Sequence, residues 1–581
     1  MASLVETAPA ADVQTGKRVT LRIDPLRLPV YAWLLLVVLL PNLLLIAVSF
    51  LSAANGRLNF VFSLGNYARL LGSAGFWRLL QATLEFSLIA SLCGALIAYP
   101  MAYYVGRIAN RNKALLTILV LVPLWISLLM RVFSWRLILG QNGVLNSFLV
   151  TSGLLEQPSA AFLYTATTVV LTFTYVSIPF VFISCLNAFE KIPAALIEAS
   201  EDSGASKFQT FCFVIWPLTR RSLAIGFSLA FLVTVGDYVT PAMVGGMSGT
   251  TLGVLISSQF GMANNWPYGA ALSIALILCV SVILAIVMWL CPARGVFSGD
   301  EGGAARAGAP AVATPAAWAR LSGALFYVLA IAFLYSPLLL MVLFSLNDSS
   351  LQSFPLQGFT WRWYEALAGN AGLIAAAQRS VIVAVCVVLA STLVGTGFAL
   401  ALHYRRGPGS QLIELLLALP LAMPAVVLGI VMVLGTELVG VPSGLPRTIV
   451  GQASFIMPVT MLLVLTRLRR LDPSLMEASR DLGAGRMRSF IHVILPLIRG
   501  AVISGALLGL TLSADDVMVT LFLSGPSQTL PIWVFNQMRF GFTPSVNAVF
   551  TLLGAIALVS VILSQVVVRL RATSPLDPTS G

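Results

Sequence analysis

Long apolar stretches separated by short polar ones run through almost the whole chain. An apolar helix of about 20 residues, rising 1.5 Å per residue, crosses a hydrocarbon core of roughly 30 Å. We predict spanning helices in the first half near residues 30–52, 79–105, 114–139, 161–187, 219–244 and 269–291. The second half repeats the number, near 321–346, 376–403, 411–436, 448–466, 498–523 and 546–568. The pattern predicts an all-α polytopic membrane protein made of two tandem six-helix units.

The composition agrees with this prediction. Of the 581 residues, 58% are hydrophobic and 10% are charged, and the mean hydropathy is +0.93. Soluble domains carry about 25% charged residues, so a soluble globular chain is excluded. The formal net charge of +12 could indicate nucleic-acid binding, but the basic residues follow the membrane topology instead. The six cysteines lack metal-ligand spacing and predict neither a metal site nor a disulfide framework.

A segment rich in Gly, Ala and Pro, from Arg294 to Ala317, separates the two sets of helices. It has no apolar periodicity, which is typical of a flexible tether. The predicted domains are a cytoplasmic N-terminal tail at 1–28, a first membrane domain at 29–293, a cytoplasmic linker at 294–318, a second membrane domain at 319–571 and a cytoplasmic C-terminal tail at 572–581. The polar N-terminal residues lack a cleavage signal, so we interpret them as a tail.

The distribution of Lys and Arg predicts the orientation. If the N-terminus is cytoplasmic, the inner loops hold 16 of these residues and the outer loops 7. Cytoplasmic loops are enriched in positive charge, so both termini and the linker are expected in the cytoplasm. Six spans per half return the chain to its starting side, which predicts a parallel repeat. We expect a multi-pass protein of a bacterial inner membrane, in contact with the lipid bilayer.

One polar segment occurs twice, at Glu198–Leu218 and Glu477–Leu497, with an offset of 279 residues. Each copy predicts a short helix, a glycine break and a second short segment that runs into a proline. For a single copy, an ordinary amphipathic loop helix would be an adequate interpretation. Two copies in register indicate an internal repeat with a shared role on the inner side of the membrane.

This repeated segment resembles the EAA loop of the permeases of ABC importers. The matching residues are Glu198, Ala199 and Gly204 in the first copy and Glu477, Ala478 and Gly483 in the second; Ser200 and Ser479 replace the third residue of the motif. The resemblance implies a type I importer permease whose loops dock on two copies of a cytoplasmic ATP-binding subunit. It also implies an extracytoplasmic binding protein that delivers a small-molecule substrate.

The two halves resemble different subunits of spermidine/putrescine importers. In the first half the resemblance rests on Arg131–Arg136, Gly140–Asn146 and Gly236–Pro241; in the second it rests on Phe354–Tyr364 and Ser513–Val517. It implies that the first and second permease subunits are fused in one chain that imports polyamines. Permeases for ferric iron, thiamine, aminoethylphosphonate and opines share much of the pattern, so these substrates remain alternatives.

No sequence motif on the chain indicates catalysis. A G-x-x-x-x-G-K-[S/T] phosphate loop is missing from the sequence, and the two histidines, His403 and His492, lack ligand partners at helical spacing. We therefore predict a permease that is not an enzyme, needs no cofactor of its own, holds no metal and binds no nucleic acid. A secondary transporter or a channel is the alternative of another class, but neither explains the paired inner segments.

Ionisable residues within predicted spans are candidates for the transport pathway, because burying a charge in a bilayer is costly. Asp237 and Asp516 lie 279 residues apart, Asp515 precedes Asp516, and Tyr238 follows Asp237. We expect the carboxylates to attract ammonium groups and Tyr238 to offer a cation–π contact. In the alternative interpretation, the carboxylates pair with the backbone or with Arg131 and Arg136 and hold helices together. Arg131 is also a candidate for the pathway, although a structural role is favoured for it.

Overall fold

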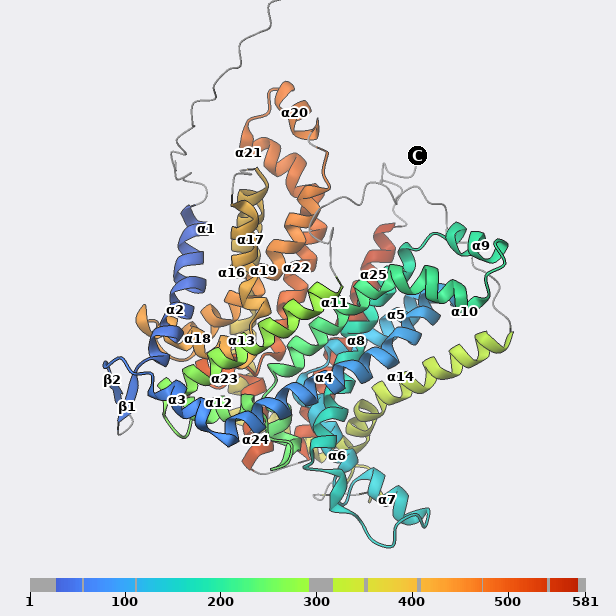
Figure 1. Ribbon diagram of the computed structural model, residues 1–581, viewed down its shortest axis with the longest axis vertical. Helices are drawn as coiled ribbons and strands as arrows, with labels where there is room; N and C mark the ends of the chain where they lie inside the picture. Colours follow the sequence, from blue (N-terminus) through green and yellow to red (C-terminus); the bar gives the residue numbers. More distant parts are fainter. Residues whose placement is uncertain are drawn as a thin grey trace, which may run out of the picture.

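The computed structural model describes residues 28–54, 57–109, 112–291, 317–349, 354–404, 409–472, 474–540 and 544–572. The predicted N-terminal tail before residue 28, most of the predicted linker (up to residue 316) and the predicted C-terminal tail after residue 572 lie outside these residues. The helices and the short hairpin of the described residues are shown in Figure 1.

The first half opens with one span built from α1 (Leu28–Trp33), the π-helical η2 (Leu34–Leu39) and α2 (Leu40–Ser49). The hairpin of β1 (Ser52–Ala54) and β2 (Arg57–Asn59) follows it. The remaining elements are α3 (Gly65–Gly72), α4 (Ala74–Tyr103), η3 (Tyr104–Ile108), α5 (Lys113–Leu121), η4 (Val122–Trp125), α6 (Leu128–Leu139), α7 (Val144–Thr151), η5 (Ala160–Phe162), α8 (Ala166–Lys191), α9 (Ala194–Asp202), α10 (Lys207–Thr210), η6 (Phe211–Ile215), α11 (Trp216–Val235), η7 (Pro241–Gly245), α12 (Leu252–Phe260) and α13 (Trp266–Leu290).

The second half follows the same plan with fewer insertions. Its elements are α14 (Ala317–Ser345), α15 (Arg362–Ala368), α16 (Ala371–Tyr404), α17 (Ser410–Ala422), α18 (Ala425–Leu438), α19 (Leu445–Arg469), α20 (Ser474–Asp481), α21 (Arg486–Ser489), η8 (Phe490–Ile494), α22 (Leu495–Asp515), α23 (Thr520–Leu523), α24 (Leu530–Phe540) and α25 (Ser545–Ala572).

The predicted all-α polytopic fold is confirmed. The described residues contain nine straight helices that are long and apolar enough to span a membrane, and eleven spans if each of two bent pairs counts as one. The twelfth predicted span corresponds to α25, which begins at Ser545. Because a bilayer core leaves backbone groups no water to bond with, helices are the expected solution for each apolar stretch.

The third span of each half is not the continuous helix that the sequence predicts. In the first half, α5 and α6 meet at an angle of 91°, and in the second half α17 and α18 meet at 111°. Pro123 lies in the 3-10 turn before the first break, and Pro424 is the residue before α18. Proline removes a helical hydrogen bond and restricts the preceding residue, which explains breaks at these positions.

The fifth span of each half also differs from its prediction. Helix α11 ends at Val235 and α22 at Asp515, earlier than the predicted ends at 244 and 523. Asp237 and Asp516 therefore lie in the turns before the short helices η7 and α23, where the first backbone N–H groups have no helical partner and can bond with a carboxylate. This difference in helix length decides what the carboxylates contact.

The two halves exchange their first spans. Helix α14 packs on the first half, where the Tyr327 hydroxyl donates to Leu116 O (2.6 Å) and the Tyr335 hydroxyl to Leu119 O (3.0 Å). In the other direction, Val30 and Leu34 of the first span are buried in a cluster with Phe398 of α16. Each half therefore packs against the first span of the other, so these contacts join the halves in addition to the chain connection.

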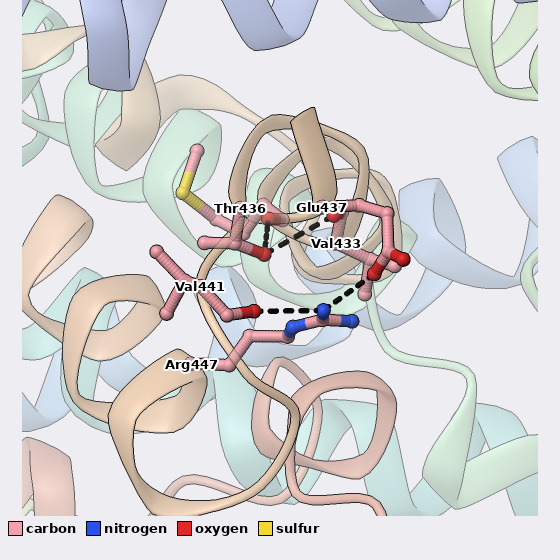
Figure 2. A network of polar contacts seen from close by, with 6 residues as sticks. Val433, Thr436, Glu437, Val441 and Arg447 are labelled. Carbon is pink, nitrogen blue, oxygen red and sulfur yellow. Dashed lines mark hydrogen bonds and ion pairs between the residues drawn. The ribbon is translucent and has the colours of Figure 1, made fainter. Parts of the chain in front are cut away.

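An arginine fixes the turn between α18 and α19. Figure 2 shows Arg447 reaching the carbonyl oxygen of Val441 (2.9 Å) and the carboxylate of Glu437, while Thr436 bonds back into its own helix. Arg447 closes a loop that the sequence places on the outer side of the membrane.

Candidate functional site: two inner elbows and a buried carboxylate cluster

The repeated segment of the first half forms a compact bend that we call the first elbow, Ala194–Thr210. Gly204 follows α9 with φ +84°, a conformation that glycine adopts without a steric penalty. The Gly204 N–H donates to Glu201 O (2.9 Å) and the Ala205 N–H donates to Ser200 O (3.1 Å), which closes the end of α9. Between the two short helices, the hydroxyls of Ser200 and Thr210 lie 3.0 Å apart.

The second elbow, Ser474–Ser489, repeats these hydrogen bonds. Gly483 has φ +78°, its N–H donates to Arg480 O (2.8 Å), and the Ala484 N–H donates to Ser479 O (3.1 Å). The hydroxyls of Ser479 and Ser489 lie 2.7 Å apart. Every one of these contacts is displaced by 279 residues from its counterpart, so the sequence repeat is also a structural repeat.

Both elbows expose their distinctive side chains. In Figure 1, α20 lies at the top of the view and α9 at the right, both away from α7 at the bottom. Glu198, Ala199, Glu477 and Ala478 are exposed, whereas Ser479 is buried inside its elbow. The motif therefore divides into an outward face and an inward serine.

Asp237 is held by its own turn. Its carboxylate accepts hydrogen bonds from the backbone N–H groups of Val239 (2.8 Å) and Thr240 (2.9 Å) and from the Thr240 hydroxyl. The side chain is 3% exposed. These contacts match the interpretation in which a buried carboxylate fixes the backbone, because buried charges need such partners.

Asp516 has a similar turn but a different setting. It accepts hydrogen bonds from the N–H (3.0 Å) and hydroxyl (2.6 Å) of Thr520, and Gln452 Nε2 lies 3.5 Å away. Gln452 also donates to the Thr520 hydroxyl (2.8 Å) and accepts from the Ser513 hydroxyl (2.5 Å). Unlike Asp237, Asp516 is only half-buried.

Asp515 crosses between the halves. Its two oxygens each lie 3.0 Å from the backbone nitrogen of Leu128, the first residue of α6. The carboxylate therefore caps a helix that begins at the break in the third span, where the first N–H groups have no helical partner. The equivalent residue of the first half is Gly236, which has no side chain that could form such a cap. A Cβ built on Gly236 would lie 2.8 Å from the nitrogen of Ala425 at the start of α18.

Arg131 lies on α6, one turn beyond Leu128, and is 6% exposed. Its charge acts on both Asp237 and Asp515, and its buried Nε has no hydrogen-bond partner among the described residues. It does not reach the surface. Arg136, by contrast, donates to Met538 O (3.4 Å) and so contacts α24 of the second half.

Tyr238 also joins the two halves. Its hydroxyl donates to Met518 O (3.1 Å), and its ring lies 5.7 Å from that of Phe522. The structure thus brings Arg131, Asp237, Tyr238, Asp515 and Asp516 to the interface between the halves, where we group them as the carboxylate cluster. The hydrogen-bond partners in this cluster, Leu128, Gln452 and Ser513, were not predicted. Only Leu128 had a signal in the sequence, which is the proline near the break in the third span.

The fold and the paired elbows define an inner-membrane permease of two similar halves. The model of the family described as "Binding-protein-dependent transport system inner membrane component" matches residues 90–293 and again 391–572. The chain belongs to this family and carries its domain twice, as a fused pair.

Relatives with established names cover about half of this chain each. The spermidine/putrescine transport system permease protein PotB of Escherichia coli is 34% identical over 261 residues, which is 45% of this chain and 94% of that protein. PotC of the same system and organism is 35% identical over 239 residues, 41% of this chain and 90% of that protein. A solved bacterial ABC transporter involved in the import of alginate is 17% identical, with a TM-score of 0.40, and covers 45% of this chain and 92% of its own.

Proposed function

We propose that this chain supplies two transport domains of an ATP-driven importer, at residues 29–293 and 319–571. The elbows dock on two copies of a separate cytoplasmic ATP-binding subunit. ATP binding and hydrolysis by that subunit move the elbows and so alternate the access of a central path between the two sides. An extracytoplasmic binding protein supplies the substrate.

The observation that carries the coupling role is the match of the two elbows in φ, hydrogen bonds and exposure. Each is rigidly closed at its glycine and presents a glutamate and an alanine outward. Two identical copies of a partner subunit would require two such surfaces in equivalent positions. A secondary transporter or channel has no use for them.

We propose that the substrate is a polyamine. Support comes from the relatives, which are permease proteins of spermidine/putrescine transport systems, and from the charge of the carboxylate cluster, which holds three carboxylates and one arginine, Arg131. An excess of negative charge at this interface favours a cation over an anion. Asp516, half-buried at the interface, is the carboxylate best placed to meet an ammonium group.

The elbows, both termini and the linker are then cytoplasmic, in accord with the excess of basic residues in the same loops. The first half takes the role of the first permease subunit and the second half that of the second.

The test is uptake of radiolabelled putrescine and spermidine into proteoliposomes that contain the full chain, the ATP-binding subunit with ATP inside, and the loaded binding protein outside. Thiamine and ferric iron serve as competitors. Polyamine uptake that only unlabelled polyamines suppress supports the proposal. If thiamine or ferric iron suppresses the uptake instead, that solute is assigned as the substrate.

A further inference from the structure

The two elbows share one part of their exposed surface. Leu196 and Leu475 occupy equivalent places and are both exposed, and each precedes the shared glutamate by two residues. Phe208 (76% exposed) has Met487 (69%) as its counterpart. An apolar residue on each side of a glutamate is thus common to both, as two copies of one partner would require.

The two elbows differ in the charges that their sequences carry. Glu201 of the first elbow has Arg480 as its counterpart, and Gln209 has Arg488. The first elbow holds three acidic residues and one basic residue, a formal charge of −2; the acidic residues are Glu198, Glu201 and Asp202 and the basic one is Lys207. The second holds two acidic and three basic residues, a formal charge of +1; these are Glu477, Asp481, Arg480, Arg486 and Arg488.

These charges are available to a partner. Glu201, Arg480 and Arg488 are exposed, and no ion pair within the described part of the chain engages their side chains. The difference is therefore not neutralised by neighbours.

The inner face around the elbows is basic in both halves. Arg220 and Arg499 are equivalent residues at the starts of α11 and α22, and both are exposed, as are Arg221 and Arg467. A subunit that covers this face must present an acidic surface toward the membrane, because like charges at a contact cost binding energy. Such a surface attracts the second elbow and repels the first.

We propose that the two elbows bind two identical ATP-binding subunits with unequal affinity, the second elbow tightly and the first weakly, through an acidic rim on each subunit. The inference rests on the proposed function, since it takes the elbows as docking sites. Apolar contact and the shared glutamate would align both elbows, and the charge difference would set how readily each is released. The first elbow is then the one that detaches first in each cycle.

The experiment uses the full chain in nanodiscs and the ATP-binding subunit that co-purifies with it, separated and added back in a titration. Variants are Glu201→Arg and Arg480→Glu, with Glu156→Arg as the matched control. Glu156 is an exposed acidic residue that follows α7, and Figure 1 draws α7 at the bottom of the view, away from α9 and α20. All three substitutions lie on the surface, and monodispersity by size exclusion checks their folding.

We expect two binding steps with different dissociation constants at low salt. An exposed ion pair is worth roughly 0.2–1 kcal/mol, and reversing one charge replaces an attraction by a repulsion of similar size, so a dissociation constant should shift by about two- to thirtyfold. Glu201→Arg tightens the weak step, Arg480→Glu weakens the tight one, and Glu156→Arg changes neither. The two dissociation constants should converge as the salt concentration rises, because salt screens the charges.

Two equal steps in the unaltered chain, or shifts in the same direction from both elbow variants, overturn the inference and leave the proposed function intact. If no subunit co-purifies, or if added subunit binds equally well when both Glu198 and Glu477 are changed to Arg, the proposed function fails as well. The two failures are thus distinguishable.

Discussion

Both carboxylate oxygens of Asp515 lie 3.0 Å from the backbone nitrogen of Leu128, 387 residues away in the chain. A charged side chain of the second half therefore caps the N-terminus of a helix in the first half. The other broken span has no such cap, because the equivalent residue is Gly236. The two halves are alike in plan and unlike at the point where they meet.

Removing this cap should loosen the interface. We expect Asp515→Ala to lower the free energy of unfolding by roughly 1 kcal/mol, the usual cost of removing a capping side chain, because the Leu128 N–H loses its acceptor. Thermal unfolding in detergent measures the effect, with Asp481→Ala on the exposed second elbow as control. Equal midpoints for the two variants would contradict the structural role.

Asp237 and Asp516 occupy equivalent positions in the sequence repeat, but we expect their substitution by Asn to have different effects. Asp516→Asn is expected to reduce polyamine uptake more than protein abundance, since Asp516 is half-buried at the interface. Asp237→Asn should reduce abundance first, because Asp237 is 3% exposed and fixes its own turn. Uptake per molecule, measured with immunoblot normalisation, separates the cases. Unchanged uptake by Asp516→Asn in vesicles would end the cation-attraction hypothesis.

Substitution of an elbow glycine should act through the backbone conformation at that position and not through a steric clash. A Cβ at Gly483 or at Gly485 would meet no atom within 4 Å, but only Gly483 has positive φ. Gly483→Ser should therefore strain the second elbow by about 1–2 kcal/mol and uncouple ATPase stimulation by the loaded binding protein. Gly485→Ser is a matched control, because the first elbow has Ser206 there. Identical stimulation in both variants would count against a coupling role.

The exchanged first spans should hold the halves together without a covalent link. A protease site inserted between residues 291 and 317 and cut in membranes should leave both fragments in one complex after mild solubilisation. The Tyr327 and Tyr335 hydroxyls contribute to this contact, so Tyr327→Phe with Tyr335→Phe should increase dissociation of the cut chain. Fragments that separate at once after cutting would show that the linker, not the packing, joins them.

The sequence was sufficient for the parts of the fold that depend on local pattern. Apolar length predicted the spans, and a repeat at one offset predicted two elbows, with Gly204 and Gly483 at the bend. These features need only a run of residues and its periodicity. The glycine positions in particular follow from a conformational demand that a single residue meets.

What the sequence could not supply were contacts between distant segments. The bends after Pro123 and before Pro424 change the direction of a span, and proline indicates a kink without giving its angle. The cap of Leu128 by Asp515 depends on that bend, so it could not be predicted. The shorter fifth spans turned Asp237 and Asp516 from intramembrane helix residues into turn residues with backbone partners.

The most direct test of the central claim is transport with and without the motor. Proteoliposomes holding the purified chain, binding protein and substrate should take up polyamine only when the ATP-binding subunit and ATP are present, and Glu198→Arg with Glu477→Arg should abolish that uptake. Uptake at the same rate with the ATP-binding subunit left out would contradict the account.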